Sequence, residues 1–204
     1  MTNTLHTNDL PAGLTFGSSI AIDTETMGLQ PGRDRLCLVQ ISSGDGHCHM
    51  VHFTNPPDYS APNLKIILNN SDTLKIFHYA RFDIAMIERY LGITCRPVYC
   101  TKIASRLVRT FTDRHGLKDL CKELLNIDIS KQQQSSDWGG KKLSLEQQTY
   151  AASDVLHLHE IKRILDERLD REDRHSLAAE CFNFLPTRAH LDLSGWGDDD
   201  IFQH

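Results

Sequence analysis

The sequence of 204 residues lacks any apolar run that approaches the roughly 18 to 20 residues of a membrane-spanning helix. Its first residues, MTNTLHTNDLPAG, also lack the basic segment followed by an apolar segment that is typical of a secretory signal. Six cysteines are scattered with no C-x-x-C pair, and a chain of this size needs no disulfide framework, so we expect reduced, mostly buried thiols. Together these absences predict a cytosolic protein with no membrane partner.

A surplus of basic residues is absent as well, since the formal net charge is −5 at pH 7. Proteins that coat long nucleic acids use many lysine and arginine contacts to phosphates, so this balance argues against that class. A short anionic substrate remains compatible with it, provided that a metal ion supplies positive charge locally. Because 40% of residues are hydrophobic and 24% charged, we expect an ordinary folded protein. We expect one domain over residues 1–204, with a polar leader at about 1–15 and a C-terminal tail at about 186–204.

Short apolar runs alternate with segments of helical periodicity, which predicts an α/β fold. The runs favour strands over residues 19–23, 35–42, 47–53 and 74–78. Helical periodicity favours helices over residues 62–68, 82–91, 101–108 and 117–125. A polar loop follows at 131–140, and the capping-box pattern Ser144-Leu-Glu-Gln147 opens a helix that we expect to run to about Leu169.

Three histidines fall in the third predicted strand, at His47, His49 and His52. Such a group suggests a metal site. Alternation along a strand, however, places His47 and His49 on one face and His52 on the other. The pattern therefore favours a solvated edge strand over a metal site.

Two carboxylates end the first predicted strand, at Asp23 and Glu25. Residues two apart on a strand point to the same side, so both groups can grip one cation. Asp170 and Glu172 show the same spacing within a charged helix face, so the spacing alone is not specific. The context is different, because acids on a buried strand cost free energy unless they are paired or metal-bound.

Further candidates follow on helices. Asp83 begins a predicted helix after a buried strand, where it either takes part in a metal site or caps the helix. Tyr150 and Asp154 are four residues apart on the last long helix and share a face. Tyr79 and Asp83 have that spacing too, so the ordered set carries the prediction rather than any one pair. Four carboxylates and a tyrosine in this order are what two-metal hydrolysis of a phosphodiester requires.

The runs AIDTETMGL, KIFHYARFDIAMI, SDW and QTYAASDVLHL resemble the three exonuclease motifs of the DEDDy superfamily, in its ribonuclease D branch. The segments LCLVQISSGDG, CTKIASRL, TDRHGLKDLC, NIDISKQQQSSDW and FLPTRAHLDLSGW are similar to the nanoRNase C family in particular. The resemblance implies a ribonuclease H-like exonuclease fold, with a central mixed sheet flanked by helices. The C-terminal helical RNA-binding domains of ribonuclease D have no counterpart here, which weakens an expectation of tRNA processing.

The resemblance also implies roles for the candidate residues. Asp23, Glu25 and Asp154 would bind catalytic metal ions directly, and Asp83 would hold the second ion directly or through water. Tyr150 would orient the attacking water. The ions are expected to be two Mg²⁺ or Mn²⁺, which all-oxygen sites favour over zinc.

Substrate contacts are expected from three segments. The first follows the metal strand, the second precedes Asp83, and the third is the loop before the catalytic helix. Their candidate residues are Thr24, Met27, Gly28, Leu29, His78, Arg81, Gln133, Ser136 and Trp138. Several have alternatives: Leu29 contacts a base or packs in the core, His78 bonds a ribose or ends a strand, and Trp138 stacks on a base or anchors its loop. For Trp138 the anchor is favoured.

These expectations converge on a 3′-to-5′ exoribonuclease that hydrolyses very short RNA of two to about seven nucleotides, or short DNA, to nucleoside 5′-monophosphates. A general exonuclease on longer RNA or single-stranded DNA would use the same catalytic set. A catalytically silent binding protein ranks lower, because all five motif residues are present. The resemblance further implies a homo-oligomer, a ring-shaped octamer.

Overall fold

The predicted strands form the middle of a mixed sheet in the computed structural model, which describes residues 2–197 and 199–203. In chain order the elements are β1 (Thr2–Thr7), β2 (Ser19–Thr26), β3 (Leu36–Ser42), β4 (His47–His52), α1 (Pro62–Asn69), β5 (Leu74–Phe77), α2 (Ala80–Leu91), β6 (Val98–Cys100), α3 (Thr101–Val108), α4 (Leu117–Leu120), α5 (Leu145–Leu156), α6 (Leu158–Arg171) and α7 (His175–Leu193). A π-helical turn, η1 (Cys121–Leu125), extends α4. The α/β class is confirmed.

The six strands lie in the order β1-β4-β3-β2-β5-β6. β3 is antiparallel to both β2 and β4, whereas β5 runs parallel to β2 and β6 parallel to β5. All of β3 is buried, which explains its nearly continuous apolar sequence. β2 therefore lies inside the sheet, and its C-terminal end is available to carry functional side chains.

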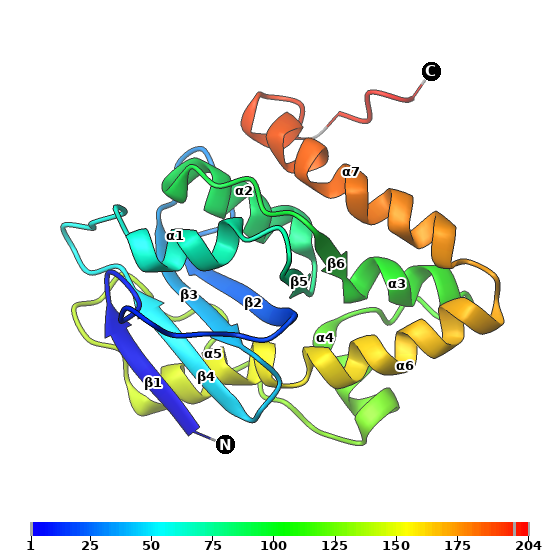
Figure 1. The fold of residues 1–204 in the computed structure, drawn as a ribbon, viewed down its shortest axis with the longest axis horizontal. Helices are drawn as coiled ribbons and strands as arrows, with labels where there is room; N and C mark the ends of the chain where they lie inside the picture. Colours follow the sequence, from blue (N-terminus) through cyan, green and yellow to red (C-terminus); the bar gives the residue numbers. More distant parts are fainter. Residues whose placement is uncertain (1, 198, 204) are drawn as a thin grey trace.

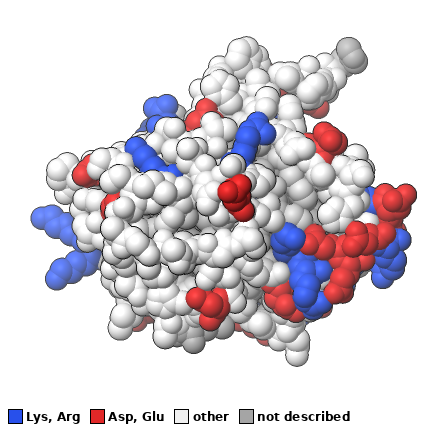
Figure 2. Space-filling view, viewed as in Figure 1, with Lys and Arg blue, Asp and Glu red and all other residues white. Residues whose placement is uncertain are grey.

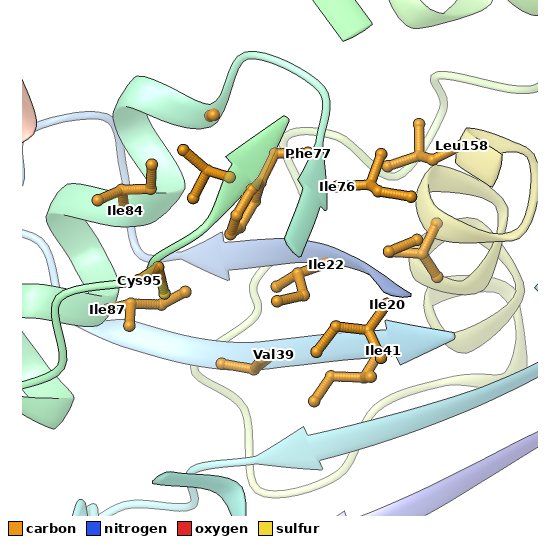
Figure 3. Packing of buried hydrophobic residues seen from close by; sticks show 14 of the residues in the cluster. Ile20, Ile22, Val39, Ile41, Ile76, Phe77, Ile84, Ile87, Cys95 and Leu158 are labelled. Atoms are coloured by element: carbon orange, nitrogen blue, oxygen red, sulfur yellow. The ribbon is translucent and has the colours of Figure 1, made fainter. Parts of the chain in front are cut away.

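Helices cover both faces of this sheet (Figure 1). α1 and α2 lie on one side, α5 lies on the other, and α3, α6 and α7 extend the molecule beyond β6. Between the sheet and the helices, apolar side chains of β2, β3 and β5 meet those of α2 and α6 (Figure 3). This core fixes β2 and α2 relative to each other.

Several element predictions need correction. The predicted polar leader contains β1, which pairs in parallel with β4, so the prediction of β4 as an edge strand is wrong. β1 escaped detection because its sequence, TNTLHT, is polar and almost wholly exposed. The strand β6 and the helix α7 were not predicted either, and α7 extends well into the predicted tail.

The predicted long helix is also wrong in its extent. Its capping box is confirmed, since the Ser144 side chain accepts from the Gln147 backbone and Gln147 bonds back to Ser144. The helix ends at Leu156, and α6 starts at Leu158. Between them His157 has φ −104° and ψ −5°, away from ideal helical values.

The C-terminal tail predicted at about 186–204 includes Asp198, which lies outside the described residues, while Asp199 and Asp200 are exposed. Phe202 rests against Phe184 of α7, with ring centroids 5.9 Å apart. On the face shown in Figure 2, basic and acidic side chains intermix over α6, where they form ion pairs, rather than making a continuous basic stripe. Among the described residues, no helix is both long and apolar enough to cross a membrane.

Candidate active site

Three carboxylates from two elements meet at the end of β2. Asp23 and Glu25 point to the same side of the strand, as the alternation predicted, and face Asp154 on α5. Each offers one oxygen, and these oxygens lie within 4.8 Å of one another. Carboxylate oxygens at this spacing suit a hard divalent cation such as Mg²⁺, Mn²⁺ or Ca²⁺.

Asp83 lies beside this group in the first turn of α2. Thr24 points to the opposite side of β2 from its neighbours, and its hydroxyl donates to Asp83 Oδ1 at 2.7 Å. Asp83 is 4% exposed and is not one of the three carboxylates that share the close spacing. Asp83 therefore lies at the margin of the cluster rather than among its most closely spaced oxygens.

Gln40 is a residue that the sequence analysis missed. It is fully buried on β3, opposite Asp23 in the strand register, and its Nε2 donates to Asp23 Oδ2 at 3.3 Å. This hydrogen bond fixes the orientation of the Asp23 carboxylate. The available signal was a lone amide inside the apolar run LCLVQIS, since a buried amide needs a partner.

The pKa values of the four carboxyl groups indicate that they need a positive charge beside them to be ionised together. Burial raises the pKa of Asp23 far above its usual range, and repulsion from Asp83, Asp154 and Glu25 adds to the shift. Burial likewise raises the pKa of Glu25 to about 9, again with repulsion from Asp154 and Asp83. The pKa of Asp83 and that of Asp154 each rise to about 7, mainly because of burial. Four such groups ionise together only beside a cation.

Tyr150 lies one turn before Asp154 on α5, as predicted, and its hydroxyl bonds the Asp154 side chain. Burial and the neighbouring negative charges raise its pKa well above the ordinary value. Tyr150 is therefore a neutral phenol that donates to Asp154, rather than a base. Its ring lies 6.0 Å from that of Trp138.

These groups open into a cleft of about 780 Å³. Seven of the nine predicted substrate residues line it: Thr24, Met27, Gly28, Leu29, His78, Ser136 and Trp138. Leu29 is 83% exposed, which removes the alternative of core packing. Trp138 is only 1% exposed, which favours the loop anchor over a stacking surface.

The loop before α5 is fastened to the site by polar contacts. Gln147 donates to the Ser136 hydroxyl and to the Asp137 carbonyl, each at 3.0 Å. Arg35 donates to the Gly139 carbonyl at 3.0 Å. A Cβ at Gly139 would meet the Met27 sulfur, so the loop lies directly against the segment after β2.

Two predicted substrate residues lie elsewhere. Arg81 and Gln133 are not among the residues that line the cleft. The Arg81 guanidinium instead binds Asp192 of α7 at 2.6 and 2.7 Å and donates to the Gly197 carbonyl. The structure does not bring Arg81 to the cleft as a substrate contact, because its side chain projects toward α7. Gln134 lines the cleft in place of Gln133.

Two lysines in the cleft were not predicted as site residues. Lys102 lies over the Tyr79 ring, with Nζ 4.2 Å from its centroid, and Lys131 is close enough to lower the pKa of Asp154. Burial and both lysines lower the pKa of His78 to about 3, so His78 is neutral. Its Nδ1 lies 2.9 Å from Thr101 Oγ1. Lys102 and Lys131 therefore place positive charge in an otherwise acidic cleft, where it can interact with a phosphate.

The raised pKa values predict that a divalent ion stabilises the protein more strongly at high pH. A carboxylate whose pKa is raised by folding contributes its stability below the unfolded pKa of about 4 and loses it as the pH rises through the folded value. For Asp154 and Asp83 this stability is lost as the pH rises from about 4 to about 7, and for Glu25 the loss continues to about pH 9. Metal-free protein is therefore less stable at pH 8 than at pH 5.5.

Saturating Mg²⁺ or Mn²⁺ should raise the Tm by about 5 to 10 °C at pH 8, as expected for an ion at 100 times its Kd, and by less than about 2 °C at pH 5.5. Differential scanning fluorimetry measures the shift. Potassium chloride at equal ionic strength is the control for screening. Equal shifts at both pH values would contradict the assignment.

Sheet, helices and carboxylate cleft together define an exonuclease-type nuclease fold. Residues 6–170 match the 3′-5′ exonuclease family, and the chain belongs to that family. It is similar to NrnC of Brucella melitensis. The structure of that protein with bound Mg²⁺ is 51% identical, with a TM-score of 0.95 over 100% of both chains. NrnC bound to pGG is 52% identical, with a TM-score of 0.96 over 100% of this chain and 99% of that one. The resemblance to the ribonuclease D branch, and to nanoRNase C within it, is confirmed.

The ribonuclease D of Gluconacetobacter diazotrophicus is 34% identical over 155 residues, which is 76% of this chain and 39% of that protein. The chain thus spans about two fifths of the length of the ribonuclease D relatives that it matches. Escherichia coli RNase D, at 23% identity and a TM-score of 0.73, shares the fold over 84% of this chain. The ribonuclease H-like exonuclease fold is confirmed.

Proposed function

We propose that this protein is a 3′-to-5′ exoribonuclease that hydrolyses very short RNA, diribonucleotides included, to nucleoside 5′-monophosphates. The observation that carries the proposal is the cluster of Asp23, Glu25, Asp83 and Asp154 beside a protonated Tyr150, within one cleft. The likeness to NrnC along the full length of the chain, including a structure with bound pGG, supports the substrate class.

Each residue has a defined task in this proposal. Two Mg²⁺ or Mn²⁺ ions, when bound, would activate a water molecule and neutralise charge on the leaving 3′ oxygen. Asp23, Glu25 and Asp154 would hold the first ion, and Asp83 would hold the second. Tyr150 orients the water by accepting a bond from it while donating to Asp154. Gln40 and Thr24 keep Asp23 and Asp83 in place.

Short substrates fit the surroundings of the cleft. Leu29 and Met27 project apolar side chains at one wall, where they can contact a terminal base or ribose. Lys102 and Lys131 also line the cleft and can bind a phosphate. The net charge of −5 favours a few local contacts over a long basic track. The octameric ring, the cytoplasmic location and activity on short DNA stay predictions.

Substrate length is the property that tests the proposal most directly. With end-labelled RNAs of two, three, seven and twenty nucleotides at equal concentrations of ends, we expect the dinucleotide to have the highest kcat/KM, by at least about tenfold over the 20-mer, which is about 1.4 kcal/mol. EDTA should abolish all activity. Preference for the 20-mer would favour a general 3′ exonuclease on longer RNA or single-stranded DNA. Failure to cleave any length with Mg²⁺ or Mn²⁺ would favour a binding protein.

A further inference from the structure

A cluster of three histidines lies on the outer strands, away from the catalytic cleft. The parallel register pairs Thr2 with His47 and Thr4 with His49, so the side chains of these residues and of His6 share one face. His6 Nε2 is 3.0 Å from His49 Nδ1, and the two rings stack with centroids 5.3 Å apart. The ring of His47 is 4.5 Å from that of His49. The sequence analysis saw only two histidines on this face, because β1 was not predicted.

The chemical state of these imidazoles suits a metal ion. Burial and the neighbouring His47 lower the pKa of His6 and of His49, so both rings are neutral at pH 7 and each has one unprotonated nitrogen. His6 Nε2 and His49 Nδ1 share a hydrogen bond, and an ion between them takes the place of its proton, which moves to the other nitrogen of the donating ring. A tetrahedral ion holds each imidazole nitrogen at about 2.0 to 2.1 Å, which places two ligand nitrogens about 3.3 Å apart. The observed separation of 3.0 Å is a few tenths of an ångström short of that value. All three side chains are half-buried, so an ion can reach them.

His47 becomes a ligand only if its side chain rotates. His47 Nδ1 is 2.6 Å from Thr2 Oγ1, and its Nε2 is 3.2 Å from Thr4 Oγ1. Both hydroxyls are exposed and find water as an alternative partner. Rotation of the His47 side chain therefore exchanges these two surface hydrogen bonds for coordination to the ion.

We propose that a divalent ion of the zinc class binds between His6 and His49, with His47 as the third ligand and water completing a tetrahedral shell. Imidazole ligands favour Zn²⁺, Cu²⁺ and Ni²⁺, whereas the carboxylates of the cleft favour Mg²⁺ and Mn²⁺. None of the three histidines lines the cleft. The protein thus has two metal sites of different chemistry at separate places in the fold.

We expect the bound ion to stabilise the edge strand β1 on the sheet. β1 lies at the outside of the sheet (Figure 1), and five of its six residues are exposed. An ion shared by His6 on β1 and His49 on β4 adds a stronger link to two strands that are joined by backbone pairing and by exposed side-chain hydrogen bonds. Because binding requires the paired strands, the ion stabilises their pairing.

The experiment uses the full chain without a histidine tag, in saturating Mg²⁺ so that the carboxylate site is occupied. Isothermal titration with Zn²⁺ measures stoichiometry, and hydrogen exchange with mass spectrometry follows residues 2–7. We expect one equivalent of Zn²⁺ and slower exchange of this segment on binding. His49→Ala and His6→Gln should lose the equivalent, while His175→Ala, an exposed histidine on α7, should retain it.

Circular dichroism and nuclease activity, unchanged in both variants, show that the fold is intact, so a loss of Zn²⁺ cannot be attributed to unfolding. Retention of the equivalent in the His6→Gln, His49→Ala double variant would overturn the site. Zn²⁺ binding without slower hydrogen exchange of residues 2–7 would overturn the proposed stabilisation of β1. Absence of Zn²⁺ binding to the parent protein at micromolar concentration would overturn the whole proposal.

Discussion

Asp154→Asn should reduce kcat/KM on a diribonucleotide by roughly a thousandfold or more, while raising the Tm of the metal-free protein at pH 8. The loss follows because Asp154 is one of three carboxylates that converge on one cation position. Removing about 4 kcal/mol of transition-state stabilisation corresponds to a factor of about a thousand. Steady-state kinetics with Mn²⁺ and thermal unfolding in EDTA measure the two effects.

The gain in stability has the same origin as the loss of activity. Asp154 is buried beside other carboxylates that repel it, and asparagine keeps the shape without the charge. Relief of about 2 kcal/mol would raise the Tm by about 4 to 8 °C for a protein of this size. At pH 5.5 the gain should shrink, because the parent carboxyl is then protonated.

Asp170→Asn is the matched control, because Asp170 and Glu172 repeat the spacing of Asp23 and Glu25 at the exposed C-terminal end of α6. It should change neither kcat/KM nor Tm by a measurable amount. An Asp154→Asn protein that is less stable than its parent in EDTA would show that the carboxylate cluster is not electrostatically strained. Activity within tenfold of the parent would remove Asp154 from the metal site.

Tyr150→Phe should lower kcat by about 100-fold to 1,000-fold, with little change in KM or in the Tm shift produced by Mn²⁺. Removing a group that positions the reacting water costs an amount in the range of general acid–base catalysis. The ring remains to pack near Trp138, so the fold is preserved. Because the raised pKa keeps Tyr150 protonated, the alkaline limb of the parent pH profile should not report its ionisation.

Tyr90→Phe is the corresponding control, since its hydroxyl donates to the Asp34 carbonyl outside the cleft. Full kcat in Tyr150→Phe would mean that the water is oriented by another group. A large loss of Mn²⁺ stabilisation in this variant would instead show that Tyr150 acts through the metal ligands.

Most of the central elements were predictable because their signals are local. The strand over Leu36–Ser42 is a continuous apolar run, and the start of α5 is marked by reciprocal bonds between Ser144 and Gln147. β1 and β6 were missed for the opposite reason: one is polar, and the other is only three residues long. Their pairing depends on partners far along the chain.

The five catalytic candidates were identified by residue type and order, and the structure brings all of them to one cleft. Their supports were not identified. The bond between Gln40 and Asp23 depends on the register of the antiparallel strands β2 and β3. The effect of Lys131 on Asp154 depends on the path of the loop that carries Lys131. The contact of Arg81 with Asp192 was not foreseen, because nothing near Arg81 in sequence shows that α7 carries Asp192 beside it.

The sequence by itself determined the chemistry: which carboxylates exist, their spacing on β2 and α5, and the family to which they belong. Only the tertiary structure decided their electrostatic state, since burial and mutual repulsion raise the pKa of each carboxyl group. It also decided the histidine cluster, which requires β1 to lie beside β4. Side-chain types are local properties of the chain, whereas burial, charge coupling and ligand geometry arise from contacts between residues distant in sequence.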